Sequence, residues 1–383
     1  MNIGELFINF FKQMEFMQES FTWQSIIMVV VSCVLIFLAV KKDFEPYLLI
    51  PIAVGMLLVN IAPELVAAPT EDASGGLLYY ISEGVHLGIF PPLIFLGIGA
   101  TTDFGPLIAS PKSLILGAAA QIGIFITFLG ALLLGFNGLE AASIGIIGGA
   151  DGPTAIFLST TLLQDNPEMV GIIAVVAYSY MALVPIIQPP IIKLLTTKKE
   201  RLIHMEQTRV VSKRERVIFP IVIMVISILL VPSSASLIGM LMLGNLIKES
   251  GVVPNLVDAS AKTILYAVTI FLGVSVGTKA IGTSFLTFDS LKILLLGLIA
   301  FSVATATGVL FGKIMCVATK GKVNPMIGAA GVSAVPMAAR VVHKMGQKED
   351  PTNYLLMHAM GPNVAGVIGS AVAAGLLLGV FGW

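Results

Sequence analysis

Long apolar runs, separated by short polar stretches, are the feature that most limits what this chain can fold into. A membrane-spanning helix needs about 20 mainly apolar residues, and the strands of a membrane β-barrel would instead alternate apolar with polar residues. The 383-residue chain is 56% hydrophobic and 11% charged, whereas soluble domains carry about 25% charged residues. The pattern excludes an ordinary soluble enzyme and a disordered chain, and it predicts an all-α polytopic membrane protein.

Ten apolar segments predict about ten transmembrane helices, at 23–40, 46–61, 86–100, 113–136, 169–195, 217–231, 234–247, 261–277, 291–318 and 354–381. Two further segments, 141–163 and 325–342, are apolar but interrupted by glycine and proline. Inside a bilayer, non-helical backbone survives only where protein or a water-filled cavity satisfies its polar groups. We therefore expect these two segments to form re-entrant, broken-helix hairpins.

The basic residues predict the orientation. With the N-terminus outside, nearly all basic residues fall on the inside of the membrane. The exceptions are Lys12, Lys279 and Lys292, which fall outside, and Arg340, which we set aside as adjacent to the membrane. This distribution satisfies the positive-inside rule. We expect a multi-pass membrane protein, with an amphipathic N-terminal segment at 1–22 and a basic cytoplasmic linker at 196–216.

The two halves of the chain share a motif. The pattern Ile-Gly-x-x-Gly-x-x-x-x-Pro begins at Ile144 and again at Ile327. We interpret residues 23–195 and 217–383 as two inverted-topology repeats, although chance similarity among glycine- and leucine-rich helices stays an alternative. Inverted repeats with broken helices are typical of ion-coupled transporters, whose site lies near the midplane where the breaks meet.

Asp151 is the strongest candidate for a functional residue. It lies in the run Gly-Gly-Ala-Asp-Gly-Pro-Thr at 148–154, inside an otherwise uncharged apolar stretch. A carboxylate at membrane depth is costly and marks a functional site by default, and carboxylate and carbonyl oxygens suit a hard cation or a proton. The flanking glycines let the backbone unwind. Asp151 could also serve only as the cap of the following helix.

The second broken segment offers Asn324, Gly328 and Ser333, followed by Arg340. The repeat aligns Ser333 with the residue next to Asp151, so we expect the two breaks to face each other. A serine in a membrane helix commonly just bonds the preceding turn. Arg340 is either an anchor at the membrane interface or a binder of an anionic group, because its guanidinium suits a carboxylate.

Two more segments carry polar groups inside predicted spans. Tyr178 and Tyr180 lie well away from the interfacial belt where tyrosine is usual, and Asn363 occupies the corresponding position of the second repeat. The small residues around them could simply allow close helix packing. We expect the two tyrosines and the amide to line the site.

Four runs carry a resemblance to a known family: GGADGPTAIF at 148–157, AYSYMALVPIIQPPI at 177–191, NPMIGAAGVSAVPMAARV at 324–341 and GPNVAGVIGSAVAAG at 361–375. They resemble the β subunit of the biotin-dependent sodium-pumping decarboxylases, which act on oxaloacetate, methylmalonyl-CoA, glutaconyl-CoA or malonate. The resemblance extends from about residue 23 to the C-terminus. It places the essential aspartate of the family on Asp151, its functional tyrosine on Tyr180, and its Asn, Gly, Ser and Arg cluster on Asn324, Gly328, Ser333 and Arg340.

The resemblance implies a carboxybiotin decarboxylase of the bacterial inner membrane, coupled to outward Na⁺ movement with proton consumption. The carboxybiotin belongs to a partner, so we expect biotin carrier and carboxyltransferase subunits, a small single-span membrane subunit and homo-oligomers, but no nucleic acid. As a hypothesis, Na⁺ binds at Asp151, Asn363 and Ser333, with Asn324, Gly328 and Tyr178 around it.

Catalytic roles are expected for Asp151, Tyr180 and Arg340, with Arg340 holding the carboxybiotin carboxylate. The alternative is a stand-alone Na⁺- or H⁺-coupled carboxylate transporter without catalysis.

Overall fold

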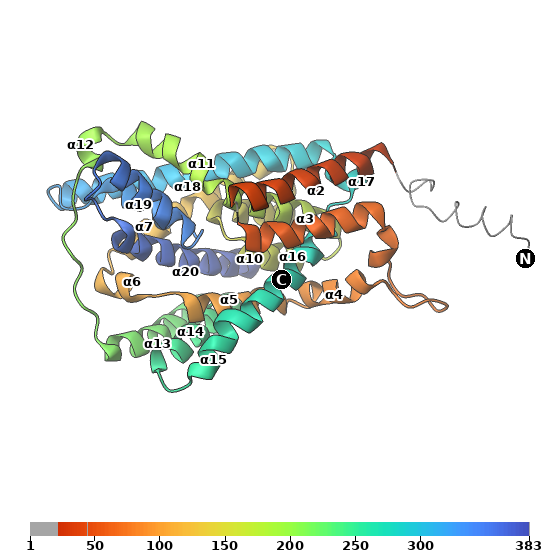
Figure 1. Ribbon diagram of the computed structural model, residues 1–383, viewed down its shortest axis with the longest axis horizontal. Helices are drawn as coiled ribbons and strands as arrows, with labels where there is room; N and C mark the ends of the chain where they lie inside the picture. Colours follow the sequence, from red (N-terminus) through yellow and green to blue (C-terminus); the bar gives the residue numbers. More distant parts are fainter. Residues whose placement is uncertain (1–21, 44, 383) are drawn as a thin grey trace, which may run out of the picture.

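The protein folds entirely into helices, with no strand among the residues that the structure describes (Figure 1). The structure is a computed structural model that describes residues 22–43 and 45–382. The amphipathic segment predicted at 1–22 therefore lies outside the described residues, apart from Thr22. The prediction of an all-α polytopic membrane protein is confirmed.

The first half of the chain runs from α2 to α11. Its elements are α2 (Trp23–Lys42), α3 (Pro46–Ile61), η2 (Pro63–Val66), α4 (Leu77–His86), α5 (Phe90–Thr101), α6 (Gly105–Ala109), α7 (Ser113–Ala120), α8 (Ile122–Leu133), α9 (Gly138–Gly145), η3 (Ile146–Gly149), α10 (Gly152–Leu162) and α11 (Pro167–Leu195). Helix starts follow local chemistry: Asn137 and Glu140 form a capping box at α9, in which each side chain accepts from the other's backbone N–H.

The second half runs from α12 to α20. Its elements are α12 (Lys198–Arg201), α13 (Lys213–Leu230), η4 (Pro232–Ser234), α14 (Ala235–Ser250), α15 (Pro254–Asp258), η5 (Ala259–Ile264), α16 (Leu265–Gly277), α17 (Gly282–Phe285), α18 (Phe288–Ala318), η6 (Pro325–Gly331), α19 (Met337–Glu349) and α20 (Leu356–Phe381). Here η5 is one π-helical segment that continues into α16.

Each of the ten predicted spans coincides with helix. Six helical stretches of the described chain are long and apolar enough to cross a membrane, namely α2, α7 with α8, α11, α15 through α16, α18 and α20. Helices α4 and α5 together form a seventh, bent by 70°. The other three predicted spans correspond to α3 and α14, with 16 residues each, and to α13, which begins with the charged run Lys-Arg-Glu-Arg. The count of ten crossings stays a prediction.

Both broken segments are discontinuous where glycine and proline predicted it. In the first, η3 ends at Gly149, Ala150 adopts left-handed backbone (φ 58°), and α10 begins at Gly152. In the second, the helical backbone stops after η6 and resumes at α19. The backbone N–H of Ser333 donates to the carbonyl of Gly149 (3.1 Å). The two breaks therefore meet, as expected; the division into inverted repeats stays a prediction.

The element η6 lies in the interior because its neighbours present glycine to it. A side-chain carbon at Gly308 of α18 would collide with the carbonyl oxygen of Gly328, and one at Gly328 would collide with the carbonyl of Gly308. Gly366 of α20 approaches the carbonyl of Gly331 in the same way. Only glycine allows backbones to approach this closely, so these positions fix the second break against the interior helices.

Candidate functional site

Asp151 is buried at the first turn of α10, with 6% of its surface exposed. Its Oδ1 accepts from the backbone N–H of Thr154 (3.3 Å), and its Oδ2 accepts from the hydroxyl of Ser370 on α20 (2.7 Å). Asp151 therefore caps α10, as the sequence allowed, and this cap occupies only one of its two carboxylate oxygens. A carboxylate oxygen has more lone pairs than these two donors use, so Asp151 can still bind a cation or a proton.

Four oxygen atoms around this carboxylate are buried without a hydrogen-bond partner in the described part of the chain: Thr154 Oγ1, Tyr178 Oη, Ser333 Oγ and Asn363 Oδ1. Buried polar atoms are normally paired, and each exception needs an explanation, such as a bound ion. A hard cation such as Na⁺ prefers oxygen ligands of this kind.

Local contacts bring these oxygens to one place. Asn363 donates its Nδ2 to the carbonyls of Val332 (2.7 Å) and Ala334 (3.4 Å), on either side of Ser333. This bonding leaves the Oδ1 of Asn363 free beside the break. The ring of Tyr178 packs directly on Gly152, where any side chain would collide with it. The structure therefore brings together four residues that the sequence predicted to be neighbours, namely Asp151, Ser333, Asn363 and Tyr178.

A cavity of about 450 Å³ leads to this cluster. Asp151 and Ser333 line it, and so do Glu45 and Asp103. Asp103 forms an ion pair with Arg216 (3.4 Å), the last residue of the basic linker. The cavity therefore opens on the side of the molecule that carries the linker.

Arg340 lies near the mouth of this cavity, on the first turn of α19. Its side chain is exposed and has no ion pair among the described residues. Burial raises the pKa of Glu45, and the positive charge of Arg340 opposes this rise. Arg340 is thus available at the entrance, although it does not reach the cluster around Asp151.

Tyr180 is placed away from the cluster, at the contact between α11 and α18. Its hydroxyl donates to the carbonyl of Leu294 (2.7 Å), and its ring packs against Phe301 with centroids 5.8 Å apart. The absent side chain of Gly297 provides room for the ring. The structure does not bring Tyr180 to Asp151, although only one residue separates it from Tyr178 in the sequence.

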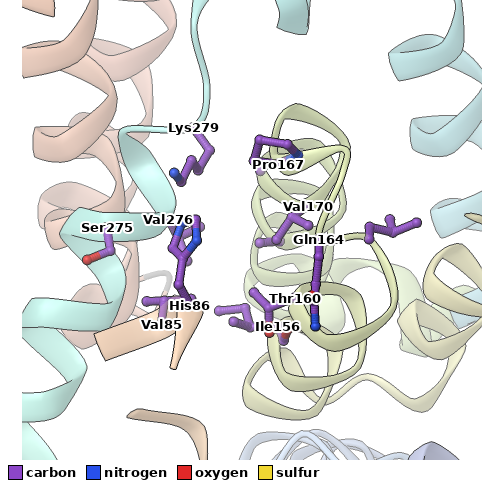
Figure 2. A pocket seen from close by; sticks show the side chains of 13 residues that line it. Val85, His86, Ile156, Thr160, Gln164, Pro167, Val170, Ser275, Val276 and Lys279 are labelled. Carbon is purple, nitrogen blue, oxygen red and sulfur yellow. Dashed lines mark hydrogen bonds between the residues drawn. The ribbon is translucent and has the colours of Figure 1, made fainter. Parts of the chain in front are cut away.

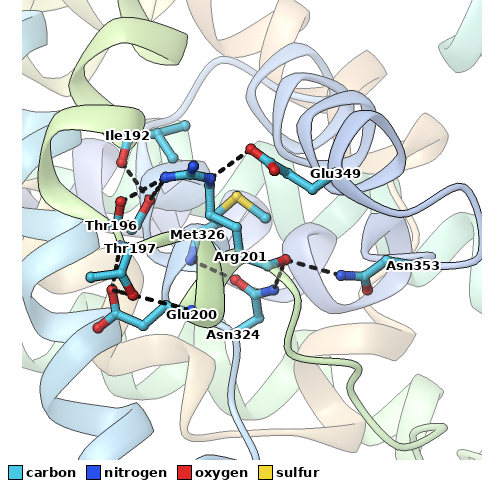
Figure 3. A network of polar contacts seen from close by, with 9 residues as sticks. All are labelled: Ile192, Thr196, Thr197, Glu200, Arg201, Asn324, Met326, Glu349 and Asn353. Atoms are coloured by element: carbon cyan, nitrogen blue, oxygen red, sulfur yellow. Dashed lines mark hydrogen bonds and ion pairs between the residues drawn. The ribbon is translucent and has the colours of Figure 1, made fainter.

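Asn324 is also placed apart from Asp151, at the opposite end of η6. Figure 3 shows its side chain in a polar network with the linker. Its Nδ2 donates to the carbonyls of Arg201 (3.1 Å) and Ile203 (2.9 Å), and its Oδ1 accepts from the N–H of Met326 (3.0 Å). Gly328, in the middle of η6, contacts α18. These contacts hold η6 in place.

Sequence reasoning missed three residues at this site. Ser370 bonds Asp151 directly, Thr154 contributes an unpartnered hydroxyl, and Glu45 lines the entrance. Ser370 and Thr154 are polar residues in apolar helices, which is a usable signal once a neighbouring carboxylate is known. Glu45 carries no sequence signal, because a charged residue in a loop between spans is ordinary.

The fold and this site together define the class of ion-coupled membrane proteins, in which broken helices meet at a buried carboxylate. The sequence profile of the Na⁺-transporting oxaloacetate decarboxylase beta subunit family matches residues 24–381. The chain belongs to this family of membrane decarboxylase subunits.

Curated relatives agree with the family. The chain is 58% identical over 379 residues to the methylmalonyl-CoA decarboxylase subunit beta of Propionigenium modestum, covering 94% of this chain and 95% of the relative. It is 55% identical to the glutaconyl-CoA decarboxylase subunit beta of Acidaminococcus fermentans, covering 95% of each. It is 50% identical to the oxaloacetate decarboxylase beta chain of Klebsiella pneumoniae, covering 92% of this chain and 94% of the relative.

Proposed function

We propose that this chain decarboxylates carboxybiotin carried by a partner subunit and couples that reaction to Na⁺ export. The observation that carries the proposal is the group of unpartnered buried oxygens around Asp151, reached by a cavity from the linker side. Family membership supports the reaction, and the oxygen cluster supports the ion.

Na⁺ would bind at Asp151, Ser333 and Asn363, with Tyr178 and the additional ligand Thr154 beside them. A proton and Na⁺ compete for the same carboxylate, because each neutralises its charge. We propose that Asn324 and Gly328 act on this site indirectly, by holding η6 and so Ser333 in position. Their hydrogen bonds and backbone contacts support this role more than direct ligation.

Carboxybiotin would enter from the linker side, where Arg340 could pair with its carboxylate. Breaking the N–C bond releases CO₂ and leaves the electron pair on the biotin nitrogen, which then takes one proton. This accounts for the proton that the reaction consumes. Tyr178, whose hydroxyl is free, is better placed than Tyr180 to pass a proton near Asp151.

The remaining features follow from the same proposal. The chain would lie in the bacterial inner membrane as two inverted repeats, 23–195 and 217–383, with the N-terminus outside and the linker cytoplasmic. Its partners would be biotin carrier and carboxyltransferase subunits and a small single-span membrane subunit, with further copies of this chain in a homo-oligomer.

The test measures decarboxylation of carboxylated carrier by the purified chain as Na⁺ is titrated. We expect activity that saturates with Na⁺ and is lost in Asp151→Asn, which keeps the size of the side chain but removes its charge. Asp258→Asn, which alters an exposed carboxylate of α15 that does not line this cavity, is the matched control and should keep its response to Na⁺. Full activity in Asp151→Asn would overturn the proposal. No decarboxylation, together with Na⁺ transport that avidin does not block, would favour a transporter without catalysis.

A further inference from the structure

A second cavity, of about 260 Å³, lies on the face of the molecule opposite the linker. It is lined by Pro167, where α11 begins, whereas the linker follows the other end of this 29-residue helix. Figure 2 shows its two walls: Lys279 and His86 lie on one, and Thr160 and Gln164 of the α10 region lie on the other. We call it the outer cavity, and the cavity that reaches Asp151 the inner cavity.

The two cavities follow one another along α11. Met181 lines the inner cavity and Ala174 lines the outer cavity. Tyr178 lies between them, about one helical turn from each, and only 2% of its surface is exposed. The ring of Tyr178, which packs on Gly152 next to Asp151, therefore belongs to the layer that separates the cavities.

Helix α16 shows the same order. Thr269 lines the inner cavity, Ser275 lines the outer cavity, and Leu272 between them is fully buried. Leu272, Tyr178 and Ile156 of α10 belong to one apolar cluster. The barrier between the Asp151 site and the outer cavity is thus about one side-chain layer thick.

The charges of the two cavities differ in sign. Carboxylates of Asp151, Glu45 and Asp103 line the inner cavity, whereas Lys279 lines the outer cavity and no acidic residue of the described chain does. Lys279 has no ion pair in this part of the chain. Burial lowers the pKa of its ammonium group, and the carboxylate of Glu83 on α4 opposes this fall from longer range. The Cβ of Lys279 packs against Gly171 of α11, which fixes the residue at the cavity wall.

We propose that the outer cavity is the exit vestibule for Na⁺, and that the ammonium group of Lys279 weakens Na⁺ binding to the Asp151 site when that site faces outward. This inference rests on the proposed Na⁺ export. A fixed positive charge in a narrow cavity raises the free energy of a cation near it. Lys279 therefore favours release of Na⁺ to the outside and opposes its return.

Such a residue is useful because export must release Na⁺ where Na⁺ is abundant. A pump can do so only if its site binds the ion more weakly in the outward-facing state than in the inward-facing state. The ligands around Asp151 are available to both states, whereas the Lys279 charge acts mainly through the outer cavity. Lys279 thus provides a difference between the two states without changing the ligands themselves.

The experiment uses the whole decarboxylase complex in proteoliposomes with the linker face outward, so that the outer cavity faces the lumen. Decarboxylation is measured while luminal Na⁺ is varied at constant ionic strength, with the membrane potential clamped by potassium and an ionophore. Luminal Na⁺ should inhibit the reaction as its product. We expect Lys279→Gln to lower the half-inhibitory Na⁺ concentration by about threefold to tenfold, the effect of one partly screened charge.

Three further variants make the result decisive. Lys279→Arg keeps the charge and should match the wild type. Gln164→Glu adds a negative charge on the opposite wall of the outer cavity. It should lower the half-inhibitory Na⁺ concentration although Lys279 itself is unchanged. Lys292→Gln removes a lysine that is paired with Asp289 (2.8 Å) away from this cavity, and should change nothing.

An unchanged half-inhibitory concentration in both Lys279→Gln and Gln164→Glu would overturn the inference. Equal shifts in Lys279→Gln and Lys292→Gln would also overturn it, because the effect would then come from general surface charge. If the rate of wild-type decarboxylation does not depend on Na⁺ on either side of the membrane, the proposed Na⁺ coupling itself is wrong. This outcome is distinct from a failure of the Lys279 inference, in which the wild type still responds to Na⁺.

Discussion

At the scale of single residues, the hydroxyl oxygen of Ser333 has no hydrogen-bond partner in the described part of the chain and is therefore available to a ligand. Its Oγ is buried, unpartnered and next to the Asp151 break. Losing one hydroxyl partner of a charged group costs about 1.5–3 kcal/mol, so Ser333→Ala should raise the Na⁺ concentration for half-maximal decarboxylation by about tenfold or more. A Na⁺ titration of the complex measures this, and biotin loading of the partner should stay normal.

Ser143 provides the matched control for Ser333. It too is a buried serine whose hydroxyl lacks a partner in the described structure, but it lies on α9 and does not line the inner cavity. Ser143→Ala should leave the Na⁺ response unchanged. If both alanine variants shift the response equally, direct ligation by Ser333 is ruled out.

Asn324 and Asn363 should behave differently although both are fully buried amides. The polar atoms of Asn324 hold the linker and η6, so Asn324→Ala should lower the free energy of unfolding by about 1–3 kcal/mol and should raise the Na⁺ requirement only as far as this loss of stability displaces η6 and Ser333. Asn363→Ala removes an oxygen beside Ser333 and should raise the Na⁺ requirement. Thermal unfolding and Na⁺ titration of both variants separate these roles. A shifted Na⁺ response with unchanged stability in Asn324→Ala would contradict this assignment.

The difference between these amides shows what the sequence can and cannot predict. Asp151 was predictable because an isolated carboxylate in an apolar run has few structural explanations. The spacing of glycine and proline likewise located both breaks. The separate positions of Tyr178 and Tyr180 were not predictable, because residues two apart on a helix point in different directions. Which neighbour each meets depends on tertiary packing against α18 and α10.

At the scale of elements, the linker is held to α19 by charged contacts on the face that carries the inner cavity. Arg201 pairs with Glu349 (2.7 Å), and His204 contacts Asp350 (3.0 Å). Hydrogen bonds from Thr352 and from His204 lower the pKa of Asp350 from its ordinary value of 3.8 to about 2. The carboxylate form is therefore the one that the folded state prefers.

This shift predicts the acid response of the linker. Because the pKa of Asp350 is lower in the folded state, its stabilising contribution is complete above about pH 3.8 and is lost as the pH falls toward about 2. Hydrogen exchange of the linker amides should therefore stay slow from neutral pH down to about 4 and, after correction for intrinsic rates, accelerate below it. In Asp350→Asn, the linker amides should exchange faster at neutral pH. Their exchange should then show no acceleration below about pH 4, because the titrating carboxylate is absent. An unchanged acid profile in that variant would contradict the prediction.

At the scale of the whole molecule, the two cavities lie on opposite faces. Residues of α10, α11 and α16 line both cavities, at different positions along each helix. Only the inner cavity reaches Asp151, so this conformation presents the site to the linker side. The sequence could predict the broken helices, but not which face was open. Which face is open depends on how the helices pack around Tyr178 and Leu272, and the hydropathy of a segment carries no information about that packing.

Thiol accessibility tests this arrangement on a single helix. In a chain whose native Cys33 and Cys316 are replaced by serine, Thr269→Cys should react with a membrane-impermeant thiol reagent added on the linker side, because Thr269 lines the inner cavity. Ser275→Cys should react from the opposite side, because Ser275 lines the outer cavity. Leu272→Cys, which is buried between them, should react from neither side while the layer is closed. Labelling of Thr269→Cys from both faces would show that the layer of Tyr178 and Leu272 does not separate the cavities, and alternating access would then have to depend on another part of the molecule.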